Sequence, residues 1–152
     1  MLTKLIKPDM HLNSLVELKL PEGIEAVVLD LEGVITPRGK ICRMPSILAK
    51  IKELKREYKV VVLSNLPYLY FNHHELITEL IENIYGLPVV ASRFFKPARR
   101  AFRVSLEYLN INEPSKVAMV GDSYFMDVLG ARLAGFGFVV KVKSLKLREI
   151  YS

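Results

Sequence analysis

Two acids separated by one residue follow an apolar run near the start of the chain. Residues 26–29 are all apolar, Asp30 comes directly after them, and Glu32 and Gly33 follow. Side chains at alternate positions of an extended chain point the same way, so Asp30 and Glu32 can share one site if the backbone stays extended past Asp30. Two carboxylates in one small site favour a bound cation, a bound proton or both. The pattern predicts a buried strand that carries acidic groups at its carboxyl end.

Other polar groups stand at comparable places further along the chain, where apolar runs end or helices are expected to begin. They are Ser64, Asn65, Lys96, Asp122 and Asp127. Each has an ordinary structural explanation, because Ser and Asn commonly cap helices and an acid at the start of a helix is favoured by the helix dipole. Lys followed by Pro is also common before a helix. No single residue of this set indicates a function by itself. Their common position at the ends of predicted elements is what suggests that they form one site.

The segments between these groups alternate between strand and helix patterns. We expect strands at 26–29, 59–63, 87–91, 117–120 and 138–140, and helices at 45–58, 75–85, 98–109 and 128–134. In the helix at 75–85, the apolar face is expected to be Leu76, Leu80 and Ile84. Such alternation predicts an α/β fold with a doubly wound parallel sheet and helices on both faces, whose ligand lies at the carboxyl ends of the strands.

A single domain accounts for the 152 residues, with 51% hydrophobic and 25% charged residues. We expect residues 1–24 to form an extension packed on that domain. Only about 34 residues separate Asp30 from Ser64, and a turn and a helix occupy them, which leaves no room for a large lid. The predicted site is therefore open to bulky substrates.

Taken in order, the polar groups resemble the four motifs of the haloacid dehalogenase (HAD) superfamily, most of whose members transfer phosphoryl groups through an aspartyl intermediate. The resemblance implies a Rossmann-like sheet without a large cap domain. It also implies a Mg²⁺ cofactor bound by Asp30, Asp122 and the backbone carbonyl of Glu32, with Asp127 near the metal. Asp30 would be the nucleophile. Ser64 would donate a hydrogen bond to the phosphoryl oxygens, with the Asn65 amide near by, and Lys96 would hold the nucleophile and the phosphate.

The likeness to one branch of that superfamily covers most of the chain. The segments that carry it are 5–9, 14–15, 119–122, 127–131 and 134–135. They resemble subfamily IIIA, known from the YqeG-like bacterial proteins and the mitochondrial phosphatidylglycerophosphate phosphatases. This likeness implies a Mg²⁺-dependent phosphatase acting on a phosphate monoester, either a small molecule or a lipid headgroup such as that of phosphatidylglycerophosphate.

Glu32 departs from the superfamily pattern, in which the second acid of the first motif is an aspartate that protonates the leaving group. The extra methylene moves the carboxylate by about 1 Å, and a displacement of that size can cost a positioned group about 100-fold in rate. Two hypotheses remain open. The chain is a working phosphatase, or it is a catalytically impaired protein that binds phosphate, anionic lipid or a partner protein.

The net charge of +6 favours anionic partners. The sequence contains two groups of basic residues. The first is Arg93, Lys96, Arg99, Arg100 and Arg103, and the second is Lys141, Lys143, Lys146 and Arg148. Each group is either a solvated surface or a contact for an anionic membrane. The aromatic Tyr68, Tyr70 and Phe71 could stack on bases, but the ordered acids would repel phosphates, so we expect no nucleic acid partner. No apolar run reaches the roughly 20 residues of a membrane span, and the amino terminus lacks a signal pattern. We expect a cytoplasmic protein, with peripheral membrane contact and homo-oligomerisation as open alternatives.

Overall fold

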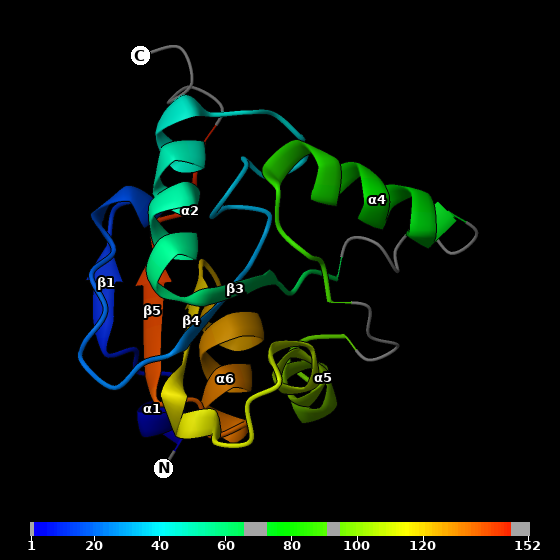
Figure 1. The fold of residues 1–152 in the computed structure, drawn as a ribbon. Coiled ribbons are helices and arrows are strands. Elements are labelled where there is room, and N and C mark those ends of the chain that lie inside the picture. The colour runs from blue at the N-terminus through cyan, green and yellow to red at the C-terminus, as the bar shows by residue number, and fades with distance from the viewer. Residues whose placement is uncertain (1, 66–72, 91–94, 147–152) are drawn as a thin grey trace.

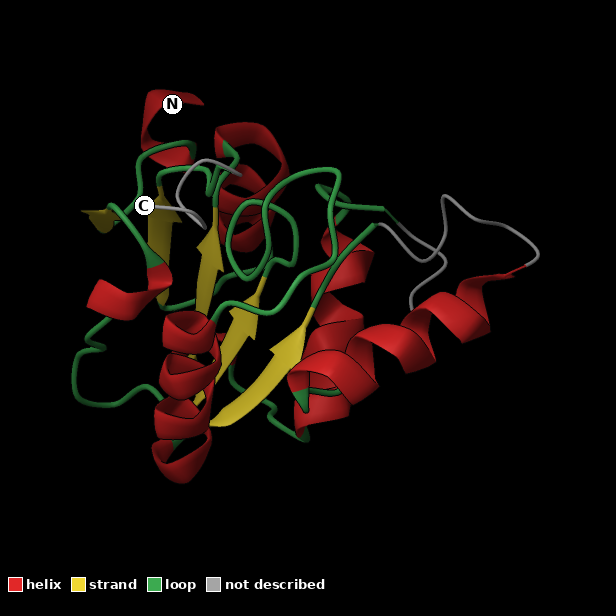
Figure 2. Ribbon diagram, turned by 90° about the horizontal axis from the view of Figure 1, so that it is seen from above, coloured by secondary structure: helices red, strands yellow, loops and turns green. Residues whose placement is uncertain are grey.

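A parallel β-sheet forms the centre of the molecule (Figures 1 and 2). The computed structural model describes residues 2–65, 73–90 and 95–146. In this part of the chain the sheet has five strands in the order β1-β5-β4-β2-β3, and all neighbouring pairs are parallel. The strands are β1 (Met10–Leu12), β2 (Ala26–Leu29), β3 (Lys59–Val62), β4 (Val117–Gly121) and β5 (Phe138–Val142). The predicted doubly wound α/β fold is confirmed.

Helices cover both faces of the sheet, as Figure 1 shows. One face carries η1 (Leu15–Glu17), α2 (Pro45–Glu57) and α4 (His74–Tyr85), and the other carries α5 (Arg99–Leu109), η4 (Tyr124–Leu129) and α6 (Gly130–Leu133). Two shorter helices, α1 (Leu2–Leu5) and η3 (Pro114–Lys116), lie at the amino terminus and before β4. Among the described residues, no helix combines the length and the apolar character needed to cross a bilayer.

The central strand β2 explains why both faces need cover. Val27 and Leu29 pack into the apolar cluster beneath α2 and α4, whereas Ala26 and Val28 pack into the cluster beneath α5 and α6. All four side chains are fully buried. A strand buried on both faces is apolar at every position, and this is the pattern that the sequence shows at 26–29.

The inward face of α4 differs from the predicted one. Leu76 and Leu80 are 63% and 44% exposed, whereas Ile81 and Tyr85 are buried. Ile84, the third residue expected to point inward, is partly buried against the core. The helix carries two neighbouring apolar stripes, and helical periodicity alone does not decide which one meets the sheet.

Three other segments also depart from the expected pattern. The strand predicted at 87–91 is reduced, in its described part, to an isolated bridge between Val62 and Val89. The last predicted helix is divided into η4 and α6, with Leu133 exposed. Residues 10–12 form β1, an edge strand that was not predicted. A strand of three residues gives too little alternation to be recognised, and its pairing with β5 decides its conformation.

Candidate active site

The carboxyl ends of β2, β3 and β4 meet at one edge of the sheet, where they surround a pocket of about 190 Å³. The pocket contains six of the seven residues predicted for the site: Asp30, Glu32, Ser64, Asn65, Lys96 and Asp127. The seventh, Asp122, lies next to them at the end of β4. The structure therefore brings the predicted residues together at one place in the fold.

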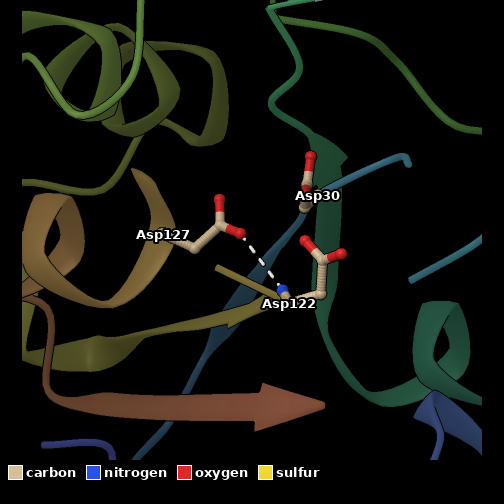
Figure 3. A group of neighbouring side chains, drawn as sticks. All are labelled: Asp30, Asp122 and Asp127. Atoms are coloured by element: carbon tan, nitrogen blue, oxygen red, sulfur yellow. Dashed lines mark hydrogen bonds between the residues drawn. The ribbon is translucent and has the colours of Figure 1, made fainter. Parts of the chain in front are cut away.

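Three buried carboxylates converge at this place, as Figure 3 shows. Asp30 follows β2, Asp122 follows β4, and Asp127 belongs to η4. One oxygen of each lies within 4.8 Å of the others. Three anionic groups at this separation repel one another in a low-dielectric environment, so the arrangement requires positive charge nearby.

Lys96 supplies part of that charge from inside the protein. Its Nζ atom donates to Oδ1 of Asp30 at 2.8 Å and to Oδ1 of Asp127 at 2.7 Å. Burial lowers the pKa of this ammonium group, but the charges of Asp127 and Asp30 outweigh burial and raise its pKa above the ordinary value. Lys96 is thus a buried cation, and its expected place in a basic surface group is wrong.

Among the described residues, donors reach only one of the two oxygens of the Asp30 carboxylate. Oδ1 accepts hydrogen bonds from the Leu31 amide and from Lys96, both at 2.8 Å. No described residue donates to Oδ2. Burial raises the pKa of Asp30 well above its usual range, Lys96 opposes this rise, and the charges of Asp127 and Asp122 add to it. A cation bound beside Asp30 would favour its ionised form.

Asp127 holds the turn that follows β4. Its Oδ2 accepts from the backbone amides of Asp122 and Ser123, both at 3.1 Å, while Oδ1 binds Lys96. A side chain at Gly121 would overlap the Asp127 carboxylate, so this turn needs glycine. Asp127 therefore fixes the position of Asp122 and pairs with the buried lysine at the same time.

The Asn65 side chain binds the backbone of Lys96. Its Oδ1 accepts from the Lys96 amide at 2.8 Å, and its Nδ2 donates to the Lys96 carbonyl at 3.3 Å. These contacts join the end of β3 to the segment before α5. Asn65 therefore positions Lys96 and also lines the pocket, as does the neighbouring buried Ser64.

Glu32 and the next residue shape the loop after β2. The Glu32 Oε2 atom accepts from the Gly39 amide at 3.0 Å, which directs the longer side chain toward the turn at 37–40. Gly33 has a φ of +85° and approaches Asp122 so closely that a Cβ atom would overlap its carboxylate. Only glycine combines this conformation with this contact at low cost.

Arg38, Ser123 and Met126 also line the pocket, and the sequence analysis did not single them out. Arg38 binds Asp122 through two hydrogen bonds, Nε to Oδ2 at 3.0 Å and Nη2 to Oδ1 at 2.8 Å. Burial lowers the pKa of the Arg38 guanidinium, but Asp122, Asp30 and Glu32 together raise it above the ordinary value. No signal in the sequence points to this pair, because 84 residues separate its members.

The other expected binding residues lie on the surface or outside the described residues. Arg99, Arg100, Arg103, Lys143 and Lys146 are exposed, and Lys141 is partly buried. Arg93 and Arg148 lie outside the described residues, as do the aromatic residues at 68, 70 and 71.

A divalent cation fits the three carboxylates chemically. Mg²⁺ prefers hard oxygen ligands and retains several waters, so it needs few carboxylates. Asp30, Asp122 and Asp127 together with Lys96 and Arg38 leave one net negative charge in the cluster. Both oxygens of Asp127 accept hydrogen bonds from the buried Lys96 and from the backbone of the turn, whereas those of Asp122 accept from the exposed Arg38 side chain, so Asp30 and Asp122 can reach a cation with less rearrangement.

The parallel sheet, the acids at its carboxyl edge and the buried lysine define a phosphatase of the HAD class. A family model described as mitochondrial PGP phosphatase matches residues 2–144, and the chain belongs to this family. It is thus a phosphoric monoester hydrolase.

A curated relative is the mitochondrial phosphatidylglycerophosphatase GEP4 of Saccharomyces cerevisiae. It is 29% identical over 138 residues, covering 86% of this chain and 75% of the yeast protein. Its name places that protein in mitochondria, so the cytoplasmic location expected here stays a prediction.

Two solved structures have the same fold at lower identity. A HAD family enzyme from Bacteroides thetaiotaomicron, in complex with magnesium and inorganic phosphate, has a TM-score of 0.52 and 14% identity, over 85% of this chain and 100% of that one. An uncharacterized protein from Listeria monocytogenes serotype 4b has a TM-score of 0.56 and 18% identity, over 74% of this chain and 75% of that one. These likenesses support the fold.

Proposed function

We propose that this phosphatase is Mg²⁺-dependent, works through an aspartyl-phosphate on Asp30 and hydrolyses phosphatidylglycerophosphate. The observation that carries the mechanism is the Asp30 carboxylate itself. It lies at a strand end, Lys96 fixes one of its oxygens, and no described residue donates to the other. Bound Mg²⁺ supplies positive charge beside the phosphoryl oxygens.

The reaction has two steps on this chain's own residues. An oxygen of Asp30 attacks phosphorus, the bond from phosphorus to the ester oxygen breaks, and Glu32 gives a proton to the departing alkoxide. Glu32 then takes a proton from water, and the water oxygen attacks phosphorus. Inorganic phosphate leaves and the Asp30 carboxylate is restored.

Three other residues have supporting roles in this proposal. Lys96 and Ser64 face the phosphoryl group from the pocket wall, and Asn65 keeps Lys96 in place through its backbone contacts. Lys96 is already charged, so it stabilises negative charge without changing protonation state.

A lipid substrate is supported by the surroundings of the pocket as well as by the family. Tyr124, Phe125 and Met126 follow the pocket residue Ser123 and are exposed, and Met126 also lines the pocket. Between β2 and β3 the chain contains only a loop and α2, so no lid covers the site from that connection. A phosphorylated headgroup at a membrane surface could therefore approach it. Peripheral contact with an anionic membrane is part of this proposal.

Phosphate release from phosphatidylglycerophosphate in mixed micelles and from p-nitrophenyl phosphate tests the proposal, in Mg²⁺ and in EDTA. We expect release only with Mg²⁺, loss of release in Asp30→Asn, and no change in Glu113→Gln, a control in which an exposed acid is replaced. Release by Asp30→Asn at the wild-type rate would exclude Asp30 as the nucleophile. A slower rate with the lipid than with the aryl ester would point to another substrate.

A further inference from the structure

Arg38 covers a carboxylate that the metal site needs. Its two hydrogen bonds occupy both oxygens of Asp122, at 3.0 and 2.8 Å. The Asp122 side chain is 1% exposed and that of Arg38 is 58% exposed, so the guanidinium shields the carboxylate from its solvent side. The contact is a bidentate, charge-assisted ion pair, which is stronger than hydrogen bonds between neutral groups.

The guanidinium and a divalent cation would compete for the same charge. One Asp122 oxygen lies within 4.8 Å of oxygens of Asp30 and Asp127, where the cation would bind. Positive charges a few ångströms apart repel strongly in a partly buried site. Arg38 therefore acts as the counter-ion of Asp122 while the cluster holds no divalent cation.

The place of Arg38 in the loop lets it reach a second anion. The turn at 37–40 is closed by the Lys40 amide bonding to the Pro37 carbonyl at 3.2 Å, and Glu32 holds the Gly39 amide. The backbone is fixed on both sides, and the Arg38 side chain is exposed, so its guanidinium can change partner by side-chain rotation once the pair with Asp122 is broken. Its guanidinium lines the same pocket as Lys96 and Ser64.

Phosphate and carboxylate groups bind arginine in the same way, because each has two oxygens that accept hydrogen bonds from the planar guanidinium. We propose that Arg38 is a phosphate-binding residue that alternates between two anions. It neutralises Asp122 in the cation-free site and pairs with the phosphate group of the substrate once a divalent cation is bound at Asp122. The inference rests on the proposed function only in taking a phosphate ester as the ligand.

This exchange predicts opposite effects of Arg38 on two affinities. Arg38 weakens cation binding, because it must first leave Asp122, and it strengthens phosphate binding. A residue that only stabilised the empty site would change the first affinity and not the second.

The experiment measures both affinities directly. Mn²⁺, which accepts the same oxygen ligands, is titrated by electron paramagnetic resonance, and inorganic phosphate is then titrated by calorimetry at saturating Mn²⁺. For Arg38→Ala we expect Mn²⁺ to bind about tenfold more tightly and phosphate about tenfold more weakly, the size of one charge-assisted hydrogen bond. Lys40→Ala removes the same charge from an exposed position in the same turn and should match the wild type in both titrations.

Unchanged or weaker Mn²⁺ binding in Arg38→Ala would overturn the inference, and so would unchanged phosphate affinity. Equal effects in Lys40→Ala would overturn it too, because they would show a general charge effect. Arg38→Lys keeps the positive charge but loses the planar guanidinium. We expect its Mn²⁺ and phosphate affinities to lie between those of the wild type and Arg38→Ala. This variant replaces Arg38→Ala in the test if the alanine variant does not fold. A wild-type chain that hydrolyses no ester would refute the proposed function while both titrations still test Arg38.

Discussion

At the scale of single residues, the site depends on side chains that satisfy several partners at once. Asp127 accepts from two backbone amides and from Lys96, so three donors point at one carboxylate. Any neutral replacement leaves at least one buried donor without an acceptor. Breaking a buried ion pair in this way costs about 3–5 kcal/mol.

We therefore predict that Asp127→Asn lowers the free energy of unfolding by about 3 kcal/mol. The amide nitrogen of asparagine would face either Lys96 or the backbone amides of the turn, and both are donors. Urea denaturation followed by circular dichroism measures the change. Glu113→Gln, which removes a solvent-exposed pair with Lys116 that contributes little to stability, is the control. Equal stability of Asp127→Asn and wild type would mean that these donors find other acceptors.

Glu32 permits a second prediction at this scale. If Glu32 protonates the leaving group and then activates water, Glu32→Gln should slow steady-state turnover by about 10²–10⁴-fold. Nitrophenolate needs little protonation on leaving, so the first step with p-nitrophenyl phosphate should survive. We expect a rapid burst of nitrophenol, close to one per enzyme, in stopped-flow absorbance. A variant without a burst, or with normal turnover, would contradict the role given to Glu32.

At the scale of elements, the loop after β2 shapes the proposed metal site through its backbone. Gly33→Ala would place a Cβ against the Asp122 carboxylate in a left-handed conformation. Gly23 has a similar φ of +94° with no atom within 4 Å of the added Cβ, so Gly23→Ala carries the backbone strain alone. We predict at least tenfold weaker Mn²⁺ binding in Gly33→Ala and wild-type affinity in Gly23→Ala, measured by titration. Equal Mn²⁺ affinities in the two variants would show that Gly33 does not affect cation binding.

The same scale shows what could be predicted from the sequence. Strands β2, β3 and β4 are mostly buried and apolar, and their ends carry the acids and the Ser-Asn pair, so local patterns predicted both the sheet and the residues that gather at its carboxyl edge. The edge strand β1 and the inward face of α4 depend on the partner segment. The hydrophobic periodicity of a segment does not show which other segment it packs against.

Side-chain pairing across the site was predicted only in part. The resemblance implied that Lys96 holds Asp30, and the structure contains this ion pair. The pair with Asp127 and the burial of Lys96, which was also placed in a basic surface group, were not predicted. Asn65 was expected near the phosphate; it lines the pocket, and its side chain also binds the Lys96 backbone, a contact that the sequence did not predict. Such contacts arise only when the sheet brings distant strand ends together.

At the scale of the whole molecule, exposed apolar side chains gather beside the pocket on a cationic protein. Phe125 is 60% exposed, and Lys141 lies 4.6 Å from the ring centre of Tyr124. Aromatic rings next to lysines are suited to the headgroup region of an anionic bilayer, where the rings enter the interface and the cations meet the phosphates. The net charge of +6 acts in the same direction.

Phe125→Ser should therefore weaken binding to vesicles that contain phosphatidylglycerol and slow hydrolysis of the lipid substrate in them. Burying a phenylalanine side chain contributes about 2 kcal/mol, so we expect vesicle affinity to fall at least tenfold. Activity on p-nitrophenyl phosphate should not change, because the ring lies outside the reacting groups.

Tyr108→Ser is the control, since Tyr108 is 50% exposed at the end of α5 remote from Lys96. Co-sedimentation at rising salt measures the electrostatic part, which should decline as charges are screened. Equal losses in both variants, or a loss of aryl phosphatase activity in Phe125→Ser, would mean that this surface is not the membrane contact.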